Sequence, residues 1–172
     1  MASGKSTLGK ELADLMQRTF IDLDELIEKK ENTSVTNIFS LKGEDYFREI
    51  ESATLKSLSN FSNAVIATGG GTPCFQDGIH WMNKHGITVY LNVSPTVLKH
   101  RLSLERSHRP LLESYKDETL LDYIIFKLSE REPFYMQAKL IVAADNIAAP
   151  LLAQAIRNTI SDSSHLNGAT DV

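Results

Sequence analysis

The stretch Ser3-Gly4-Lys5-Ser6-Thr7 decides how the chain can fold, because each residue type in it suits the binding of phosphate. Glycine lets backbone N–H groups close around phosphate oxygens, lysine supplies a positive charge, and the hydroxyl that follows can bind magnesium. Apolar residues at helical spacing continue from Leu8 to Met16, so the positive end of a helix would face the same anion. The pattern favours a phosphate-binding loop; the alternative is an ordinary helix with an exposed lysine.

The composition suits one compact domain. The chain has 172 residues, of which 42% are hydrophobic and 23% are charged. Its net charge of −4 excludes an overall basic nucleic-acid-binding protein, and no apolar run approaches the roughly 20 residues of a membrane span. The single cysteine, Cys74, cannot form an internal disulfide. We expect a cytoplasmic protein without nucleic-acid or membrane partners, with one domain over residues 1–160 and a disordered polar tail over residues 161–172.

Short β-like runs alternate with helical stretches along the chain. This alternation predicts an α/β domain with a parallel sheet and helices on both faces, in which ligands bind at the carboxyl ends of the strands. The run at residues 64–67 is apolar throughout, as expected of a strand buried on both faces. The expected strands are residues 19–21, 64–67, 87–93 and 140–142, and the expected helices are residues 6–17, 23–30, 35–41, 44–58, 76–84, 118–132 and 148–160.

Two carboxylates and three glycines follow the first two expected strands. Asp22 and Asp24 suit the binding of a magnesium-bound water by one carboxylate and the acceptance of a proton by the other. The alternative is a helix N-cap with a favourable dipole contact. Gly69, Gly70 and Gly71 are costly in conformational entropy, and a ligand close to the backbone explains them better than a simple turn does.

Arginines at three places are candidates for binding an anion. Arg48 stands one helical turn before Glu51, either as a substrate-binding arginine steadied by the glutamate or as a surface ion pair. Arg109 lies in a polar loop at about residues 106–117, which is either a lid over a polyphosphate or an exposed basic loop. Arg131, near the end of a helix, either pairs with neighbouring glutamates or serves as a second anion binder.

Taken in this order, the motifs resemble those of the shikimate kinase family, and the resemblance covers residues 1 to about 160. The ordered set is specific, because related small-molecule kinases share the phosphate loop but not the other motifs together. The matching segments are Gly-Lys-Ser-Thr at 4–7, Phe-Ile-Asp-Leu-Asp at 20–24, Phe-Arg-Glu-Ile-Glu at 47–51, Thr-Gly-Gly-Gly at 68–71, Arg-Pro-Leu-Leu at 109–112 and Arg-Glu-Pro-Phe-Tyr at 131–135.

The resemblance implies a three-layer P-loop kinase fold, in which a parallel sheet is flanked by helices and a mobile lid covers the site. It implies transfer of the γ-phosphate of ATP to the 3-hydroxyl of shikimate, in the pathway to chorismate and the aromatic amino acids. Mg²⁺ is the implied cofactor, and ATP and shikimate are the implied ligands. A monomer is expected, because members of the family are commonly monomers.

The same resemblance implies a role for each matching residue. Lys5 and Arg109 would act on the transferring phosphate, and Asp24 would bind the shikimate hydroxyls and accept the proton. Ser6 and Asp22 would hold the magnesium. The implied shikimate-binding residues are Asp24, Arg48, Glu51, Gly69, Gly70, Gly71 and Arg131, and the implied ATP-binding residues are Ala2, Ser3, Gly4, Lys5, Ser6, Thr7 and Arg109.

The chain departs from the family pattern ahead of its phosphate loop. The first glycine of the motif and the strand that leads into it would lie before Met1, and Ala2 stands where a middle glycine is common. In this fold that strand is central, so its absence predicts two exposed strand edges. Either the true start lies upstream of Met1, or the chain is a truncated, inactive remnant. A gluconate-type kinase of the same fold is the other alternative, but a neutral sugar would not need both Arg48 and Arg131.

Overall fold

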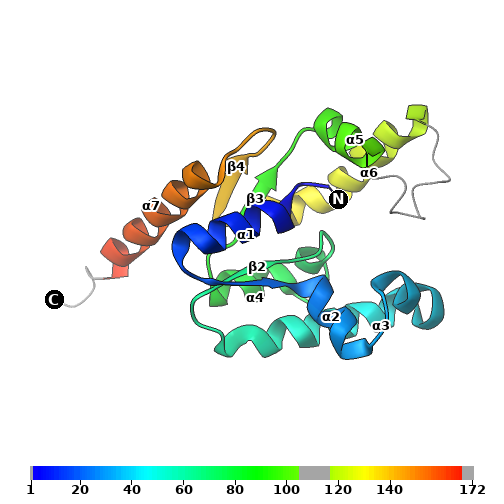
Figure 1. Ribbon diagram of the computed structural model, residues 1–172, viewed down its shortest axis with the longest axis horizontal. Coiled ribbons are helices and arrows are strands. Elements are labelled where there is room, and N and C mark those ends of the chain that lie inside the picture. The colour runs from blue at the N-terminus through cyan, green and yellow to red at the C-terminus, as the bar shows by residue number, and fades with distance from the viewer. Residues whose placement is uncertain (1, 105–116, 168–172) are drawn as a thin grey trace.

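The computed structural model describes residues 2–104 and 117–167, with side chains at 2–104 and 119–162. Strands and helices alternate along the chain as the sequence predicted, and short 3-10 helices follow α3 and β2 (Figure 1). The elements are α1 (Lys5–Met16), β1 (Thr19–Asp22), α2 (Leu23–Glu31), α3 (Val35–Ser57), η1 (Leu58–Asn60), β2 (Ala64–Ala67), η2 (Thr72–Cys74), α4 (Gly78–His85), β3 (Val89–Asn92), α5 (Pro95–Leu104), α6 (Asp117–Tyr135), β4 (Leu140–Ala143) and α7 (Ala149–Asn167).

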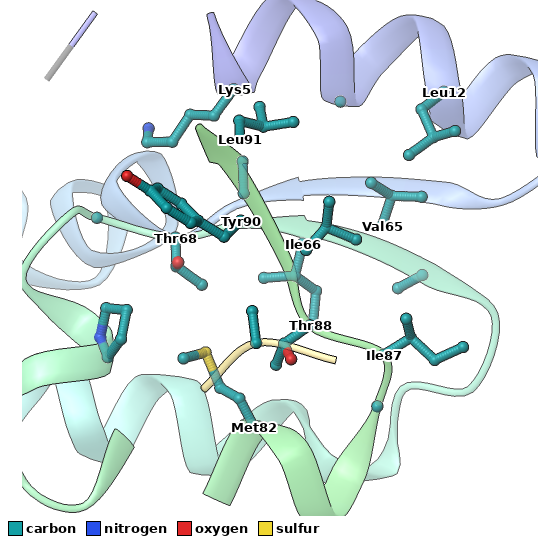
Figure 2. Close-up of a pocket in the computed structure, with 18 of the residues that line it drawn as sticks. Lys5, Leu12, Val65, Ile66, Thr68, Met82, Ile87, Thr88, Tyr90 and Leu91 are labelled. Carbon is teal, nitrogen blue, oxygen red and sulfur yellow. The ribbon is translucent and has the colours of Figure 1, made fainter. Parts of the chain in front are cut away.

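The strands form two separate parallel pairs instead of one continuous sheet. β1 pairs with β2 from Thr19↔Ala64 to Asp22↔Ala67, and β3 pairs with β4 in the same sense. Within the described residues β2 and β3 do not pair, so each keeps one edge without a neighbouring strand. A cavity of about 500 Å³ lies between them, as Figure 2 shows. This arrangement agrees with the predicted exposure of two strand edges.

The cavity explains why one sequence prediction was wrong. Residues 64–67 were expected to be buried on both faces, but the first three residues of β2 are only half-buried. Val65 and Ile66 line the cavity together with Leu12 of α1 and Met82 of α4 (Figure 2). Val65 and Ile66 are apolar, as expected of residues inside a sheet. Within the described residues no strand pairs with β2 on the cavity side, so part of their surface stays uncovered.

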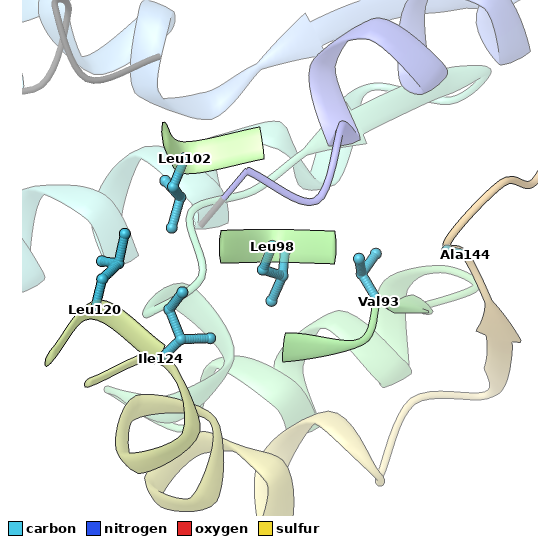
Figure 3. Close-up of a cluster of buried hydrophobic side chains, with 6 residues drawn as sticks. All are labelled: Val93, Leu98, Leu102, Leu120, Ile124 and Ala144. Atoms are coloured by element: carbon cyan, nitrogen blue, oxygen red, sulfur yellow. The ribbon is translucent and has the colours of Figure 1, made fainter. Parts of the chain in front are cut away.

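Helices cover both sides of the strands. Figure 1 shows α1 on one side of β2 and α4 on the other. Leu12 of α1 packs with α7 and with Val65, whereas Phe47 of α3 belongs to a second cluster that includes Ile66. Successive strand residues point to opposite faces, which accounts for this division. A third cluster joins α5 and α6 to the residues that directly follow β3 and β4 (Figure 3); its members are Val93, Leu98, Leu102, Leu120, Ile124 and Ala144.

Three helices differ from the sequence prediction or refine it. Gly43 interrupts α3 with φ 83° and ψ 173°, which confirms the expected break and needs the left-handed freedom of glycine. α6 continues through Pro133 to Tyr135, past the predicted end at Glu132, because the backbone angle of proline fits a helix and the N–H that it lacks is missing only from the last turn. α7 reaches Asn167, so residues 161–167 are helical where a disordered tail was expected, and residues 168–172 lie outside the described residues. None of the described helices is long and apolar enough to cross a membrane.

Candidate active site

The phosphate-loop motif leads into α1 as the sequence predicted. Gly4 is the N-cap with φ 82°, a left-handed conformation that favours glycine, and no described side chain caps the helix. Its first N–H groups are therefore available to an anion. Arg101 of α5 fixes the approach to the helix, because its Nη1 donates to the carbonyl oxygen of Ser3 at 3.0 Å and its Nη2 to that of Asp145 at 2.7 Å. Ala2 and Ser3 are half-buried, and Thr7 is exposed.

Lys5, Ser6, Asp22 and Asp24 form one polar cluster. The hydroxyl of Ser6 donates to Oδ2 of Asp22 at 2.6 Å, and Nζ of Lys5 lies 3.8 Å from a carboxylate oxygen of each aspartate. Asp22 also caps α2, because its Oδ1 accepts a hydrogen bond from the backbone N–H of Asp24 at 3.0 Å. The capping role and the functional role considered for Asp22 are thus compatible.

Asp24 lies where its ionised form is disfavoured. Burial raises the pKa of this carboxyl most, the positive charge of Lys5 lowers it, and the nearby carboxylates of Asp22, Glu51 and Glu28 raise it further. The net effect is a pKa above the ordinary value of 3.8. A carboxylate with a raised pKa is a stronger base than a free aspartate, which suits the acceptance of a proton.

Arg48 and Glu51 form a buried pair, so the surface ion pair considered for them is excluded. Their residues are 8% and 2% exposed, and Nη1 of Arg48 donates to Oε2 of Glu51 at 2.8 Å. Thr72 completes the pair from the far side by donating to Oε1 of Glu51 at 2.7 Å. Burial lowers the pKa of Arg48, but hydrogen bonds to Glu51 and Glu44 outweigh it, so the pKa is raised and the guanidinium stays charged.

The glycine run lies against these side chains and connects them. A Cβ at Gly69 would stand 3.0 Å from Oε1 of Glu51 and 3.4 Å from Oδ1 of Asp24, and a Cβ at Gly71 would collide with the guanidinium of Arg48. The carbonyl oxygen of Gly70 accepts a hydrogen bond from the hydroxyl of Tyr135 at 2.6 Å. Side chains at 69 and 71 would thus disturb Glu51, Asp24 and Arg48.

Arg131 approaches the same region from α6. It is half-buried, and it borders the cavity together with Gly69, Gly70 and Tyr135. Burial raises the pKa of Cys74, and the positive charges of Arg131 and Arg48 both lower it in part. Both arginines therefore lie close to Cys74, although the sequence separates them widely.

The polar cluster lies at one end of the large cavity rather than within it. Lys5, Thr68 and Tyr90 stand at that end, while Val65 and Ile87 stand at the other end among apolar side chains (Figure 2). The structure thus brings together Lys5, Ser6, Asp22, Asp24, Arg48, Glu51 and the glycine run around the carboxyl ends of β1 and β2, whereas Ala2 packs against the cluster of α5 and α6. Arg109 and residues 106–116 of the expected lid lie outside the described residues.

Sequence reasoning missed three residues of this site. Glu44 accepts hydrogen bonds from Nε and Nη2 of Arg48, Thr72 binds Glu51, and Tyr135 binds Gly70. The spacing of four residues between Glu44 and Arg48 was an available signal for a helical ion pair. Tyr135 ends the motif at 131–135 and Thr72 directly follows the motif at 68–71, but only the fold shows what their hydroxyl groups bind.

The oxygen donors of the cluster suit a hard cation. Among the described residues no three His, Cys, Asp or Glu side chains gather as a closed metal site. Ser6 and Asp22 instead supply two adjacent oxygen ligands, which fits a magnesium ion that takes its remaining ligands from phosphate and water.

Known proteins match this chain in sequence and in structure. The sequence matches the family described as shikimate kinase over residues 1–162. The shikimate kinase of Bacteroides fragilis is 46% identical over 147 residues, which are 86% of this chain and 82% of that protein.

Two solved structures are similar over nearly the whole chain. Shikimate kinase from Bacteroides thetaiotaomicron gives a TM-score of 0.82 at 40% identity and covers 98% of this chain and 94% of that chain. Shikimate kinase from Acinetobacter baumannii in complex with shikimate gives 0.79 at 32% identity, over 99% of this chain and 91% of that chain. With the site geometry and the matched family in agreement, the chain belongs to the shikimate kinase family.

Proposed function

We propose that this chain transfers the γ-phosphate of ATP to the 3-hydroxyl of shikimate, with the reacting groups placed between Lys5 and Arg48. The observation that carries the proposal is an unbroken series of neighbouring polar side chains from Lys5 to Arg48. Lys5 contacts Asp24, Asp24 and Glu51 both face Gly69, and Glu51 binds Arg48. Membership of the family supports the same activity. Phosphate bound at Lys5 and a carboxylate bound at Arg48 would leave Asp24 between them.

Residues 2–7 would bind the phosphates of ATP. The N-terminal N–H groups of α1 and the ammonium of Lys5 oppose the negative charge of the phosphoryl oxygens. Ser6 and Asp22 would hold a Mg²⁺ ion, which supplies further neutralisation of that charge when it is bound. Arg109, which lies outside the described residues, would add a second cation from the lid.

Asp24 would act as the base. As the 3-hydroxyl oxygen bonds to the γ-phosphorus, the bond from that phosphorus to the β–γ bridging oxygen breaks, and ADP keeps the electron pair. The hydroxyl proton passes to a carboxylate oxygen of Asp24, whose raised pKa favours its acceptance. Because phosphoryl transfer needs little covalent assistance, the main contribution of these residues is position and charge.

The two arginines would recognise the carboxylate of shikimate. Arg48 on α3 is oriented by Glu51. Arg131 comes from α6, later in the chain, and its charge acts on the same thiol of Cys74 as that of Arg48. Gly71 leaves the guanidinium of Arg48 its place, because a Cβ at this position would collide with it. Two cations at this position favour an anionic acceptor over a neutral sugar on a protein whose net charge is −4.

Steady-state measurement of ADP release tests the proposal. Shikimate should support turnover that gluconate does not, and Arg48→Met should raise the KM for shikimate by about 100-fold while the KM for ATP changes little. Arg157→Met, on an exposed residue of α7, is the matched control. Equal turnover of gluconate, or an unchanged shikimate KM in Arg48→Met, would overturn the proposal. A monomeric state and a cytoplasmic location are further expectations, and size-exclusion chromatography tests the first.

A further inference from the structure

The guanidinium of Arg48 is already occupied in the structure. Nη1 donates to Oε2 of Glu51 at 2.8 Å, while Nε and Nη2 donate to Oε1 of Glu44 at 3.1 and 2.8 Å. The ring of Phe75 lies 4.3 Å from Cζ, and Gly71 packs against Nη1 and Nη2. Three of the five N–H donors therefore point at glutamate oxygens, and an incoming carboxylate can take the Nε–Nη2 pair only by displacing Glu44.

The two glutamates differ greatly in how easily they can leave. The Glu51 side chain is 3% exposed and also accepts a hydrogen bond from Thr72, so its removal from Arg48 would strand a buried charge. The Glu44 side chain is 55% exposed, and among the described side chains only Arg48 donates a hydrogen bond to it. An exposed carboxylate regains water when it leaves, which makes Glu44 the one that yields.

The break in α3 places Glu44 for this contact. Gly43 has non-helical angles, so Glu44 begins the second helical segment of α3 and stands four residues before Arg48. Glutamate ahead of a cation at this spacing is the favourable orientation, and a helix start also favours a negative side chain. A Cβ on Gly43 would meet nothing within 4 Å, so space is open around the break.

We propose that Glu44 is a substitute for the substrate carboxylate: it occupies the Nε–Nη2 side of Arg48 in the free protein and leaves when shikimate binds. The inference rests on the proposed role of Arg48. Glu44 then keeps the guanidinium oriented before binding, at the cost of competing with the substrate. A ligand without a carboxylate cannot take over these hydrogen bonds, so Glu44 adds to the discrimination against neutral ligands.

The test compares shikimate binding to Glu44→Gln and to Glu49→Gln by titration calorimetry. Glu49 is an exposed neighbour of Arg48 on the same helix, so its variant removes the same charge without the contact. A weakened competitor should lower the Kd for shikimate about two- to fivefold in Glu44→Gln, the range expected for one exposed ion pair, and leave it nearly unchanged in Glu49→Gln. The uncharged methyl ester of shikimate should bind wild type and Glu44→Gln equally.

The outcomes distinguish a failure of the role of Glu44 from a failure of the proposed carboxylate site at Arg48. An unchanged or higher Kd for shikimate in Glu44→Gln overturns the inference, as does an equal gain for the methyl ester or for Glu49→Gln. Arg48→Met separates the two levels of the argument. If it weakens binding while Glu44→Gln has no effect, only the role of Glu44 fails; if it leaves the Kd unchanged, the proposed carboxylate site fails and the inference with it.

Discussion

Replacing Gly71 with alanine tests whether the position of Arg48 controls shikimate binding. The φ of Gly71 is −87°, which any residue adopts, so the substitution adds a methyl group without backbone strain. The added Cβ would stand 2.6 Å from Nη2 and 2.7 Å from Cζ of Arg48. Because ordinary contacts begin at 3.4 Å, the guanidinium must move by about 1 Å.

The movement is opposed by the hydrogen bonds that hold the guanidinium. The bond from Nη1 to Glu51 is 2.8 Å long, and a hydrogen bond to a charged group contributes about 1.5–3 kcal/mol. Misplacement of a substrate-binding group by about 1 Å costs on the order of 100-fold in rate, or about 2.7 kcal/mol, which lies in the same range. We expect kcat/KM for shikimate to fall about 100-fold in Gly71→Ala, mainly through a higher KM.

The assay is ADP release at saturating ATP with shikimate titrated, and circular dichroism checks that the variant is folded. Gly86→Ala is the matched control, because Gly86 has φ −168° and its added Cβ would meet only the carbonyl oxygen of Met82 at 4.0 Å. The control should keep the wild-type KM. A folded Gly71→Ala with a shikimate KM near that of wild type would refute the reasoning, since Arg48 would then tolerate displacement.

Other substitutions probe the base, the loop and the buried pair. Asp24→Asn should lower kcat by about 10²- to 10⁴-fold, and turnover near wild type would remove Asp24 as the base. Because the pKa of Asp24 is raised above 3.8 by burial, its ionisation disfavours the folded state. The melting temperature of Asp24→Asn should therefore gain on that of wild type as the pH rises through the raised pKa, and a constant difference across that range would contradict this. Tyr135→Phe should cost about 1 kcal/mol of unfolding free energy in urea and raise the shikimate KM. Tyr90→Phe is its control, since among the described residues that hydroxyl makes only a long hydrogen bond of 3.5 Å, to Asn92. Glu51→Ala should lower the unfolding free energy by roughly 3 kcal/mol, because it leaves the buried charge of Arg48 without this partner. A loss below about 0.5 kcal/mol would show that the folded state does not depend on the Arg48–Glu51 ion pair.

Local chemistry made much of the site predictable. The rule that ligands bind at the carboxyl ends of parallel strands placed Asp24 and Gly69 together, and the register Asp22↔Ala67 brings them to the same edge. The helix after Lys5 and the break at Gly43 also followed from residue type and spacing. These features depend on neighbours in sequence or on adjacent strands, which a pattern can reveal.

Contacts between distant segments were not predictable from the sequence. Tyr135 and Gly70 are 65 residues apart, and only the packing of α6 against the glycine run creates their hydrogen bond. The burial of the Arg48–Glu51 pair depends on Thr72 and Phe75, which arrive from a later segment. The half-burial of β2 likewise reflects the cavity beside it, which the apolar sequence of that strand does not reveal.

The division of the strands into two pairs has a consequence for how the two arginines are held. Asp24, Arg48 and the glycine run belong to the half built on β1 and β2, whereas Arg131 lies on α6, between β3 and β4 in the chain. Since β2 and β3 share no ladder in the described residues, the halves are joined by side-chain contacts: the packing of α1 with α7 around Leu12 and Ala153, and the hydrogen bond from Tyr135 to Gly70. The distance between Arg48 and Arg131 is therefore set by side-chain contacts, among them the hydrogen bond from Tyr135 to Gly70, and not by a strand ladder.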